Sequence, residues 1–211
     1  MATTFQTIVT EVVNQAGFDA SAADVGAWLD RRHKEMVRRS RILKGTTAVG
    51  NTVSGTAFYA VSNVLELQQL TVGGIPAGKA TRDDAYSQTQ GELLWSGEDG
   101  SSLFAVDGSA AGVSGIKLIP VPTTSGLAIV AFGTLLAPDL VLGNNVAVPD
   151  EFVDALVEGC MATGYARDQE QMGAADRCEA RFDAKCEELR QIVRRSLRPG
   201  VSQIRVVGYT A

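Results

Sequence analysis

The sequence is poor in the residues that build metal sites and disulfide frameworks. It has one histidine and three cysteines among 211 residues. Cys160, Cys178 and Cys186 all lie in segments with a helical pattern, and none belongs to a CxxC pair. An odd number of such cysteines is typical of buried free thiols in a reducing compartment. A zinc site lacks the ligands that it needs, so we expect no metal and no cofactor.

Long apolar runs are also missing. No segment approaches the ~18 apolar residues of a membrane-spanning helix. The first residues, MATTFQTIVTEVVNQ, have neither the basic start nor the apolar stretch of a secretory signal, so we expect neither a signal nor a membrane partner. The net charge of −5 and the pI near 5.0 disfavour a protein that wraps DNA. An acidic protein can still surround DNA without gripping it, because like charges repel.

Charged residues are scarce in the middle of the chain and dense at both ends. Residues 1–44 hold seven Lys or Arg and five Asp or Glu, residues 45–147 hold three and eight, and residues 148–211 hold nine and eleven. The middle is rich in glycine and threonine instead. This distribution predicts a helical segment, then strands, then a second helical segment.

The N-terminal segment has the pattern of two helices. Apolar residues recur at helical spacing over residues 5–16, after two threonines that can cap a helix. Ser21 and Asp24 then form a capping-box pattern for a second helix, which is expected to run to about Ile42. The apolar face of this second helix is expected to comprise Val25, Trp28, Leu29 and Met36.

The middle segment has the pattern of short strands. Six runs between residues 45 and 142 are rich in β-branched or aromatic residues, among them VLELQQLTV, GELLWSG, SLFAV and LAIVAFGTLL. Turn residues such as Gly73-Gly74 and Asp107-Gly108 separate them. Many short strands at this spacing predict an antiparallel β-sandwich or a small barrel.

Helical spacing returns at Pro149, which suits the first turn of a helix. The apolar residues of this helix are expected at Phe152, Val153, Leu156, Val157, Cys160 and Met161. A last helix of about seven turns is expected to place Met172, Ala175, Cys178, Phe182, Cys186, Leu189, Val193 and Leu197 on one face. Pro199-Gly200 ends it, and the tail VSQIRVVGYTA has an extended pattern.

Neither helical end has enough apolar surface to form a core alone, whereas two helical hairpins packed together would. The sequence therefore predicts an α+β fold in which residues 1–44 and 148–198 form one discontinuous helical bundle. Residues 45–147 are expected to form an inserted β-rich domain, and residues 199–211 an extended C-terminal arm.

One segment comes close to a nucleotide-binding motif. In GGIPAGKAT, residues 73–81, four residues separate Gly73 from Gly78-Lys79, as in a phosphate-binding P-loop. The motif requires Ser or Thr next, to bind magnesium, and the chain has Ala80. No long helical pattern follows. A hairpin loop is the favoured interpretation, and a nucleotide site is the weakest alternative.

The single histidine does not indicate an active site. His33 lies among arginines and lysines, without an orienting carboxylate or a nucleophile motif such as GxSxG. We interpret it as part of a solvated helix face. No other group of residues suggests catalysis, so the protein is not expected to be an enzyme.

The second helix carries a basic stripe. Arg31, Lys34, Arg38 and Arg41 fall within about 80° of one another at ~100° per residue. Together with the preceding helix, this stripe is consistent with a helix-turn-helix DNA reader. Base-reading polar residues are few at the start of the helix, so a face for an acidic protein partner is favoured slightly over DNA; a solvated face is the third interpretation.

The last helix separates its charges by sign. Asp176, Glu179, Asp183 and Glu187 lie on one side of the apolar stripe, and Arg177, Arg181 and Lys185 lie on the other. Exposed helices usually mix opposite charges in i, i+4 pairs. Separated faces suit a head-to-tail ring, in which the acidic face of one subunit meets the basic face of the next. Two solvated faces are the equally weighted alternative.

The order of these segments resembles the head-to-tail adaptor, or connector, proteins of tailed bacteriophages. The resemblance spans nearly the whole chain: a helical pair with a tryptophan (AWLDRRHKEMVRRS), a β insertion, the run GIKLIPVPTTSGLAIVAFG, a linker (LLAPDLVLGNN), the helix VPDEFVDALVEGCMATGYARD and a long final helix. The combination, rather than any single motif, carries the resemblance.

The resemblance implies a structural protein of the virion neck, assembled in the host cytoplasm. Such proteins form a ring, commonly a dodecamer, beneath the portal protein; the ring extends the channel for DNA and receives a downstream neck or tail protein. The C-terminal arm commonly docks on the portal. Carried onto this chain, the arm would use Pro199, Ile204, Val206, Val207 and Tyr209; a disordered terminus that binds nothing is the alternative. The candidate acids facing the passing DNA are Asp150, Glu151, Asp154 and Glu158, and the alternative is that the β insertion lines the channel.

Overall fold

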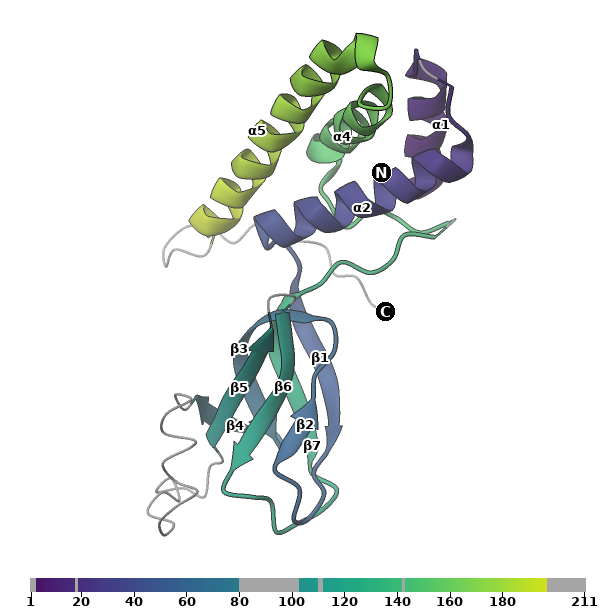
Figure 1. Cartoon of the computed structure of the whole chain (residues 1–211). Coiled ribbons are helices and arrows are strands. Elements are labelled where there is room, and N and C mark those ends of the chain that lie inside the picture. Colours follow the sequence, from purple (N-terminus) through teal and green to yellow (C-terminus); the bar gives the residue numbers. More distant parts are fainter. Residues whose placement is uncertain (1–2, 18, 80–102, 110–111, 142, 197–211) are drawn as a thin grey trace. The chain divides into compact units, whose positions relative to one another are not determined.

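The computed structural model describes residues 3–17, 19–79, 103–109, 112–141 and 143–196. The chain divides into two compact units (Figure 1). The helical unit comprises Met1–Ile42 and Ala137–Ala211, and the β unit comprises Leu43–Leu136. The predicted α+β class is confirmed. Residues 137–147, predicted to be part of the β-rich insertion, belong to the helical unit, where Leu140 and Val146 are buried.

The helical unit has four α-helices and two short 3₁₀ turns among its described residues. Their bounds are α1 Phe5–Gln15, α2 Ala22–Ser40, α4 Val153–Tyr165 and α5 Met172–Ser196, with η1 Asp150–Phe152 and η2 Gln169–Gln171. The predicted caps are confirmed: the Thr4 side chain accepts the Thr7 N–H, and Ser21 accepts the Asp24 N–H. Helix α2 ends two residues before the expected Ile42, because Arg41 adopts a left-handed conformation with φ 58°.

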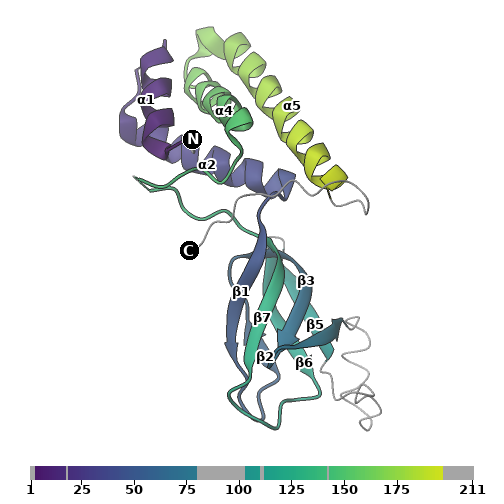
Figure 2. The ribbon, with the colours of Figure 1, turned by 180° about the vertical axis from the view of Figure 1, so that it is seen from behind.

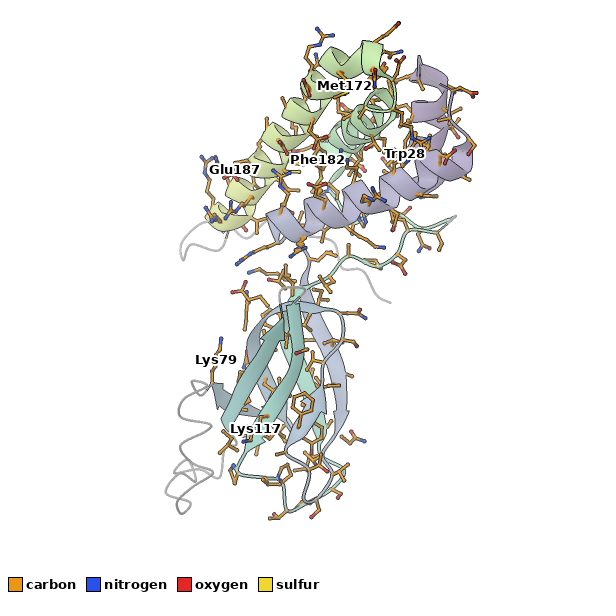
Figure 3. All side chains as sticks on the ribbon, viewed as in Figure 1. Trp28, Lys79, Lys117, Met172, Phe182 and Glu187 are labelled. Atoms are coloured by element: carbon orange, nitrogen blue, oxygen red, sulfur yellow. The ribbon has the colours of Figure 1, made fainter. Side chains whose placement is uncertain are left out.

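Helices α4 and α5 have largely the predicted apolar faces. The chain returns to helix at Pro149 through the turn η1, and Phe152, Leu156 and Cys160 are buried. Phe182 of α5 is fully buried where α5 packs on α2 and α4 (Figure 3). The prediction for Met172 is wrong: it is 47% exposed, because α5 begins beyond the end of the core. The expected core residue Leu197 lies outside the described residues.

The first residues bind the segment that precedes η1. The Phe5 N–H donates to the Asn144 carbonyl at 3.0 Å, and Thr4 forms an isolated antiparallel bridge with Asn145. The Val146 N–H donates to the Thr3 carbonyl at 3.3 Å. These contacts tie the two sequence-distant parts of the helical unit together.

The β unit contains seven described strands: β1 Lys44–Asn51, β2 Phe58–Ala60, β3 Val64–Val72, β4 Ile75–Lys79, β5 Leu103–Ser109, β6 Gly112–Ile119 and β7 Ala128–Leu135. Their order is β1-β7-β3-β4-β5-β6-β2. Figure 2 shows β1, β7 and β3 side by side. Described neighbours pair antiparallel except β4 and β5, which pair parallel where Gly78 lies beside Leu103. The strand expected at GELLWSG lies outside the described residues.

One core joins the two halves of this sheet. Leu67 and Leu70 of β3 and Ile129 of β7 belong to the same buried cluster as Phe104 of β5 and Ile116 of β6. The sheet therefore folds over on itself as a sandwich. The order of described strands ends at β1 and β2, which are not paired to each other, so the barrel alternative is not observed.

Candidate interaction surfaces

The acidic side of α5 faces basic residues of α2. Arg32 donates two parallel hydrogen bonds to Glu179, from Nη1 to Oε1 at 2.9 Å and from Nη2 to Oε2 at 2.6 Å. Arg39 Nη1 donates to Asp183 Oδ1 at 2.6 Å. Two of the four acids predicted to face another subunit thus have partners on α2, which gives the separation of charge an intramolecular reason.

Arg32 is the centre of this junction. Its guanidinium lies 5.1 Å from the ring centroid of the buried Phe182, and its Nε and Nη2 donate to Thr163 Oγ1 at 3.3 and 3.2 Å. A Cβ at Gly159 would lie 3.2 Å from Arg32 Cγ and 2.9 Å from Phe182 Cδ2, so this glycine lets three helices meet. Burial lowers the pKa of Arg32, but the hydrogen bonds and charges of Glu179 and Glu35 together outweigh burial and raise it.

We predict that Arg32→Lys lowers the free energy of unfolding of the helical unit by about 1–2 kcal/mol, because lysine cannot form the two parallel bonds or stack on Phe182. Urea unfolding followed by circular dichroism at 222 nm measures the loss. Arg31→Lys is the matched control, since Arg31 is the preceding residue of the same helix and is exposed. Equal stability of the two variants would contradict the assignment.

The basic side of α5 has one partner on α4. Arg181 Nη1 donates to Glu158 Oε1 at 2.8 Å, and this hydrogen bond raises the pKa of Arg181. The remaining pairs lie along α5 itself: Lys185 with Glu188 at 2.7 Å and Glu187 with Arg190 at 3.3 Å.

Asp176 and Arg177 have no ion pair within the part of the chain that the structure describes, and both are exposed. They are the residues of the two charged sides that are left for a neighbouring molecule. A contact of these sides with another subunit stays a prediction.

The basic stripe of α2 is divided by the fold. Arg31 and Arg38 are exposed, whereas Lys34 is held by two carboxylates, Asp30 at 2.6 Å and Asp139. Both hydrogen bonds raise the pKa of Lys34, and the bond to Asp139 has the larger effect. Arg41 lies beyond the helix end. Helix α2 also contacts α1, α4 and α5, so packing within the helical unit reduces the surface of α2 that a partner could reach.

The prediction that His33 lies on a solvated face is wrong. His33 is 0% exposed, and its Nε2 accepts the Ala147 N–H at 3.0 Å. Its Nδ1 is buried without a hydrogen-bond partner among the described residues. Burial lowers the pKa of His33 to about 4; Asp30 opposes this change and Lys34 adds to it.

His33 belongs to a clamp on the segment that returns to the helical unit. The three clamp residues Asp30, His33 and Lys34 share one side of α2 at i, i+3 and i+4. Asp30 Oδ1 accepts the Leu140 N–H at 2.8 Å, His33 holds Ala147, and Lys34 holds the side chain of Asp139. The clamp therefore holds Asp139, Leu140 and Ala147 against α2.

The candidate acids facing DNA have different surroundings. Asp150 Oδ1 accepts the N–H and hydroxyl of Thr3 at 3.3 and 3.2 Å, and Glu158 is paired with Arg181. Glu151 and Asp154 are exposed. Asp154 and Glu158 line an open groove of about 480 Å³ together with residues of α1 and α5. Whether these acids face DNA stays a prediction.

The P-loop-like segment forms a hairpin as far as the structure describes it. Gly73 and Gly74, with φ 59° and 83°, join Val72 of β3 to Ile75 of β4. Strand β4 runs to Lys79, whereas a P-loop needs an open loop at these positions. The hairpin prediction is confirmed for residues 73–79; residues 80 and 81, and the whole arm of residues 199–211, lie outside the described residues.

The thiols are not activated. Cys160 and Cys186 are buried and Cys178 is half-buried. Burial raises the pKa of Cys160 to about 12 and the pKa values of Cys178 and Cys186 to about 11. Within the described ranges, no group of three or more His, Cys, Asp or Glu residues is placed to hold a metal ion, and no helix is long and apolar enough to cross a membrane.

The described residues form an ion-paired helical unit interrupted by a β-sandwich. Residues 3–205 match the SU10 adaptor protein family, and the chain belongs to that family. The resemblance to phage head-to-tail adaptors is thereby confirmed, and the protein is a phage adaptor. No curated protein matches the chain.

Arg32 and Arg39 are the junction residues that sequence analysis missed. The available signal was that α2 carries basic residues and that α5 carries a row of acidic residues. The pattern of α5 alone could not say whether the basic partners of its acidic side lay in the same chain or in another one.

Proposed function

We propose that the protein forms a ring, with twelve subunits as in the proteins that it resembles, beneath the portal of a tailed phage. The ring extends the DNA channel and carries the next neck or tail component. The match of the SU10 adaptor protein family to residues 3–205 is the observation that carries this proposal. The role requires surfaces rather than catalysis.

The surfaces left open by the fold support contacts between subunits. Asp176 and Arg177 are exposed at the first turns of α5, one on each charged side. Arg31 is exposed on α2. Opposite charges on different surfaces of one chain favour head-to-tail contacts, which close into a ring when the rotation between subunits allows it.

The tail sequence supports docking on the portal. Ile204, Val206, Val207 and Tyr209 form an apolar pattern in a segment without a helical period. An extended peptide with such a pattern can add as a strand to a partner, with alternate side chains entering pockets. The net charge of −5 suits a channel through which DNA must pass without binding, because the negative charges of the protein repel the phosphates.

Light scattering of the full chain, alone and mixed with the candidate portal, tests the proposal. A dodecamer has a mass of about 270 kDa, since one chain has 22.3 kDa. We expect either this ring or a complex that forms on the portal. A truncation after Arg198, and the full-length double variant Ile204→Asp, Val206→Asp, are expected to lose portal binding, while the matched control Gln203→Asp keeps it.

The proposal would be overturned if the protein is a monomer and does not bind the portal, either with or without residues 199–211. Ring formation without loss of portal binding in the truncation would retain the ring and reject the role of the arm. The two parts of the proposal are therefore tested separately by one set of proteins.

A further inference from the structure

One end of the β unit is an apolar surface built from three loops. We call it the distal surface: residues 51–57, 73–77 and 119–127, at the end opposite the positions where the chain enters at Leu43 and leaves at Leu136 (Figure 1). Val53 and Ile75 are 53% and 54% exposed, and Val121 and Leu127 are 44% and 42% exposed. Large apolar side chains gathered on adjoining loops are typical of an interaction site.

Hydrogen bonds hold two of these loops together. The buried Thr52 donates from Oγ1 to the Thr124 carbonyl at 2.8 Å and accepts the Leu127 N–H at 3.0 Å. The Gly55 N–H donates to the Pro122 carbonyl at 2.9 Å. Leu127 in turn lies against the third loop, because a Cβ at Gly73 would be 3.3 Å from its Cδ2. The surface is thus ordered before any partner binds, which reduces the entropic cost of binding.

The loop beside β2 is fixed in the same way. The Tyr59 hydroxyl accepts the Val53 N–H at 3.0 Å and donates to the Thr56 carbonyl at 2.9 Å. The Ser54 N–H donates to Ser125 Oγ at 2.8 Å. Val53 is therefore presented to solvent by a backbone that is held on both sides.

The distal surface carries no charge. Residues 51–57, 73–77 and 119–127 contain no Asp, Glu, Lys or Arg, although charged residues are 20% of the chain. DNA is excluded as the occupant, because binding to phosphates requires Lys or Arg. A strongly charged protein surface is also disfavoured, since its charges would lose water without gaining partners.

We propose that the distal surface docks an uncharged, apolar protein surface of the next virion component. The inference rests on the proposed function, which assigns portal binding to the C-terminal arm and so leaves this end for another partner. A pair of distal surfaces from two copies is not the occupant, because it would be two-fold, whereas the proposed ring uses head-to-tail contacts. A neighbouring copy that covers the distal surface with another part of the chain is an outcome that the self-association measurement below distinguishes.

The test compares full-length proteins for binding to each purified neck and tail protein of the same virion by biolayer interferometry. The distal variant is Val53→Asp with Val121→Asp, both at exposed positions that leave the core intact. Its matched control is Ser62→Asp with Gln68→Asp, also exposed in the β unit but outside the distal surface. Circular dichroism and thermal unfolding verify that both variants are folded.

We expect one of these proteins to bind the wild type, and we expect the distal variant to raise Kd at least about tenfold, because it places charges in an apolar contact. The control keeps the wild-type Kd. Raising NaCl from about 50 to 500 mM should change Kd less than about threefold, because the contact contains no ion pairs.

Three results would overturn the inference: equal binding by both variants, binding that weakens steeply with salt, or a change in self-association that only the distal variant shows. Absence of binding to all the neck and tail proteins would overturn it as well. If the portal is still bound in that case, the proposed function stands and only the partner of the distal surface is rejected.

Discussion

Gly133→Ala is expected to lower the free energy of unfolding of the β unit by about 3 kcal/mol or more, because a backbone clash in a packed core cannot relax locally. A Cβ at this position would lie 2.1 Å from the Glu66 carbonyl oxygen and 3.1 Å from Leu67 Cα. Gly133 occupies the central part of β7, opposite Leu67 of β3 and Gly45 of β1. The register of β3 shifts on both sides of Glu66 and Leu67, which brings this carbonyl over the glycine.

Gly45→Ala is the matched control on the neighbouring strand. The atoms within 4 Å of its added Cβ belong to the side chain of Leu135, at 3.1 and 3.9 Å, and a leucine side chain can move. We expect a loss below about 1 kcal/mol. Urea unfolding followed by near-ultraviolet circular dichroism compares the two variants. If Gly133→Ala is as stable as Gly45→Ala, the close approach of β3 and β7 is not as described.

Acid is expected to destabilise the helical unit through His33. The pKa of His33 is about 4 in the folded protein, below its ordinary value of 6.5, because burial disfavours the charged ring. Above pH 6.5 the ring is neutral in both states and its contribution to stability is complete. As the pH falls from 6.5 through 4, the unfolded chain binds a proton that the folded protein does not bind, and stability is lost.

The expected loss is about 3 kcal/mol between pH 6.5 and 4, at about 1.4 kcal/mol per pKa unit. Urea unfolding at pH 7.5, 5.5 and 4.5, followed by circular dichroism at 222 nm, measures it. His33→Gln serves as the comparison, because its side-chain oxygen can accept the Ala147 N–H and does not titrate. His33 is the only histidine, so the difference between the two pH profiles isolates its proton.

Parallel profiles for wild type and His33→Gln would show that His33 does not titrate as described. A lower stability of His33→Gln at every pH, with a flat difference, would indicate a packing effect only. The expected result is a difference that shrinks as the pH falls, because the loss caused by the His33 proton occurs in the wild type alone.

Local pattern and turn chemistry determined most of the secondary structure. Ser21 and Asp24 marked the start of α2, Pro149 marked the return to helix, and Gly73-Gly74 marked the hairpin between β3 and β4. These signals act over a few residues, and the conformations that they favour do not depend on distant parts of the chain. The α+β class followed from the change in charge and in hydrophobic period along the chain.

Only the tertiary structure decided the roles of polar residues at the edge of the apolar faces. His33 lies four residues after Leu29 and four before Val37, which is core spacing, yet its charged neighbours in sequence suggested a solvated face. Burial was decided by residues 139–147, which cover that side of α2 and supply the Ala147 N–H. A helix pattern records which residues share a side, but it does not record what packs against that side.

The same limit explains the charges of α5. The sequence by itself determined that Glu179 and Asp183 lie on one side and Arg181 on the other, because α-helical spacing is fixed. It could not determine that Arg32, about 147 positions away from Glu179, meets it at 2.6 Å. Long-range pairing depends on how whole helices pack, through Gly159 and Phe182, and opposite charges from the same chain satisfy these faces as well as charges from a neighbouring subunit.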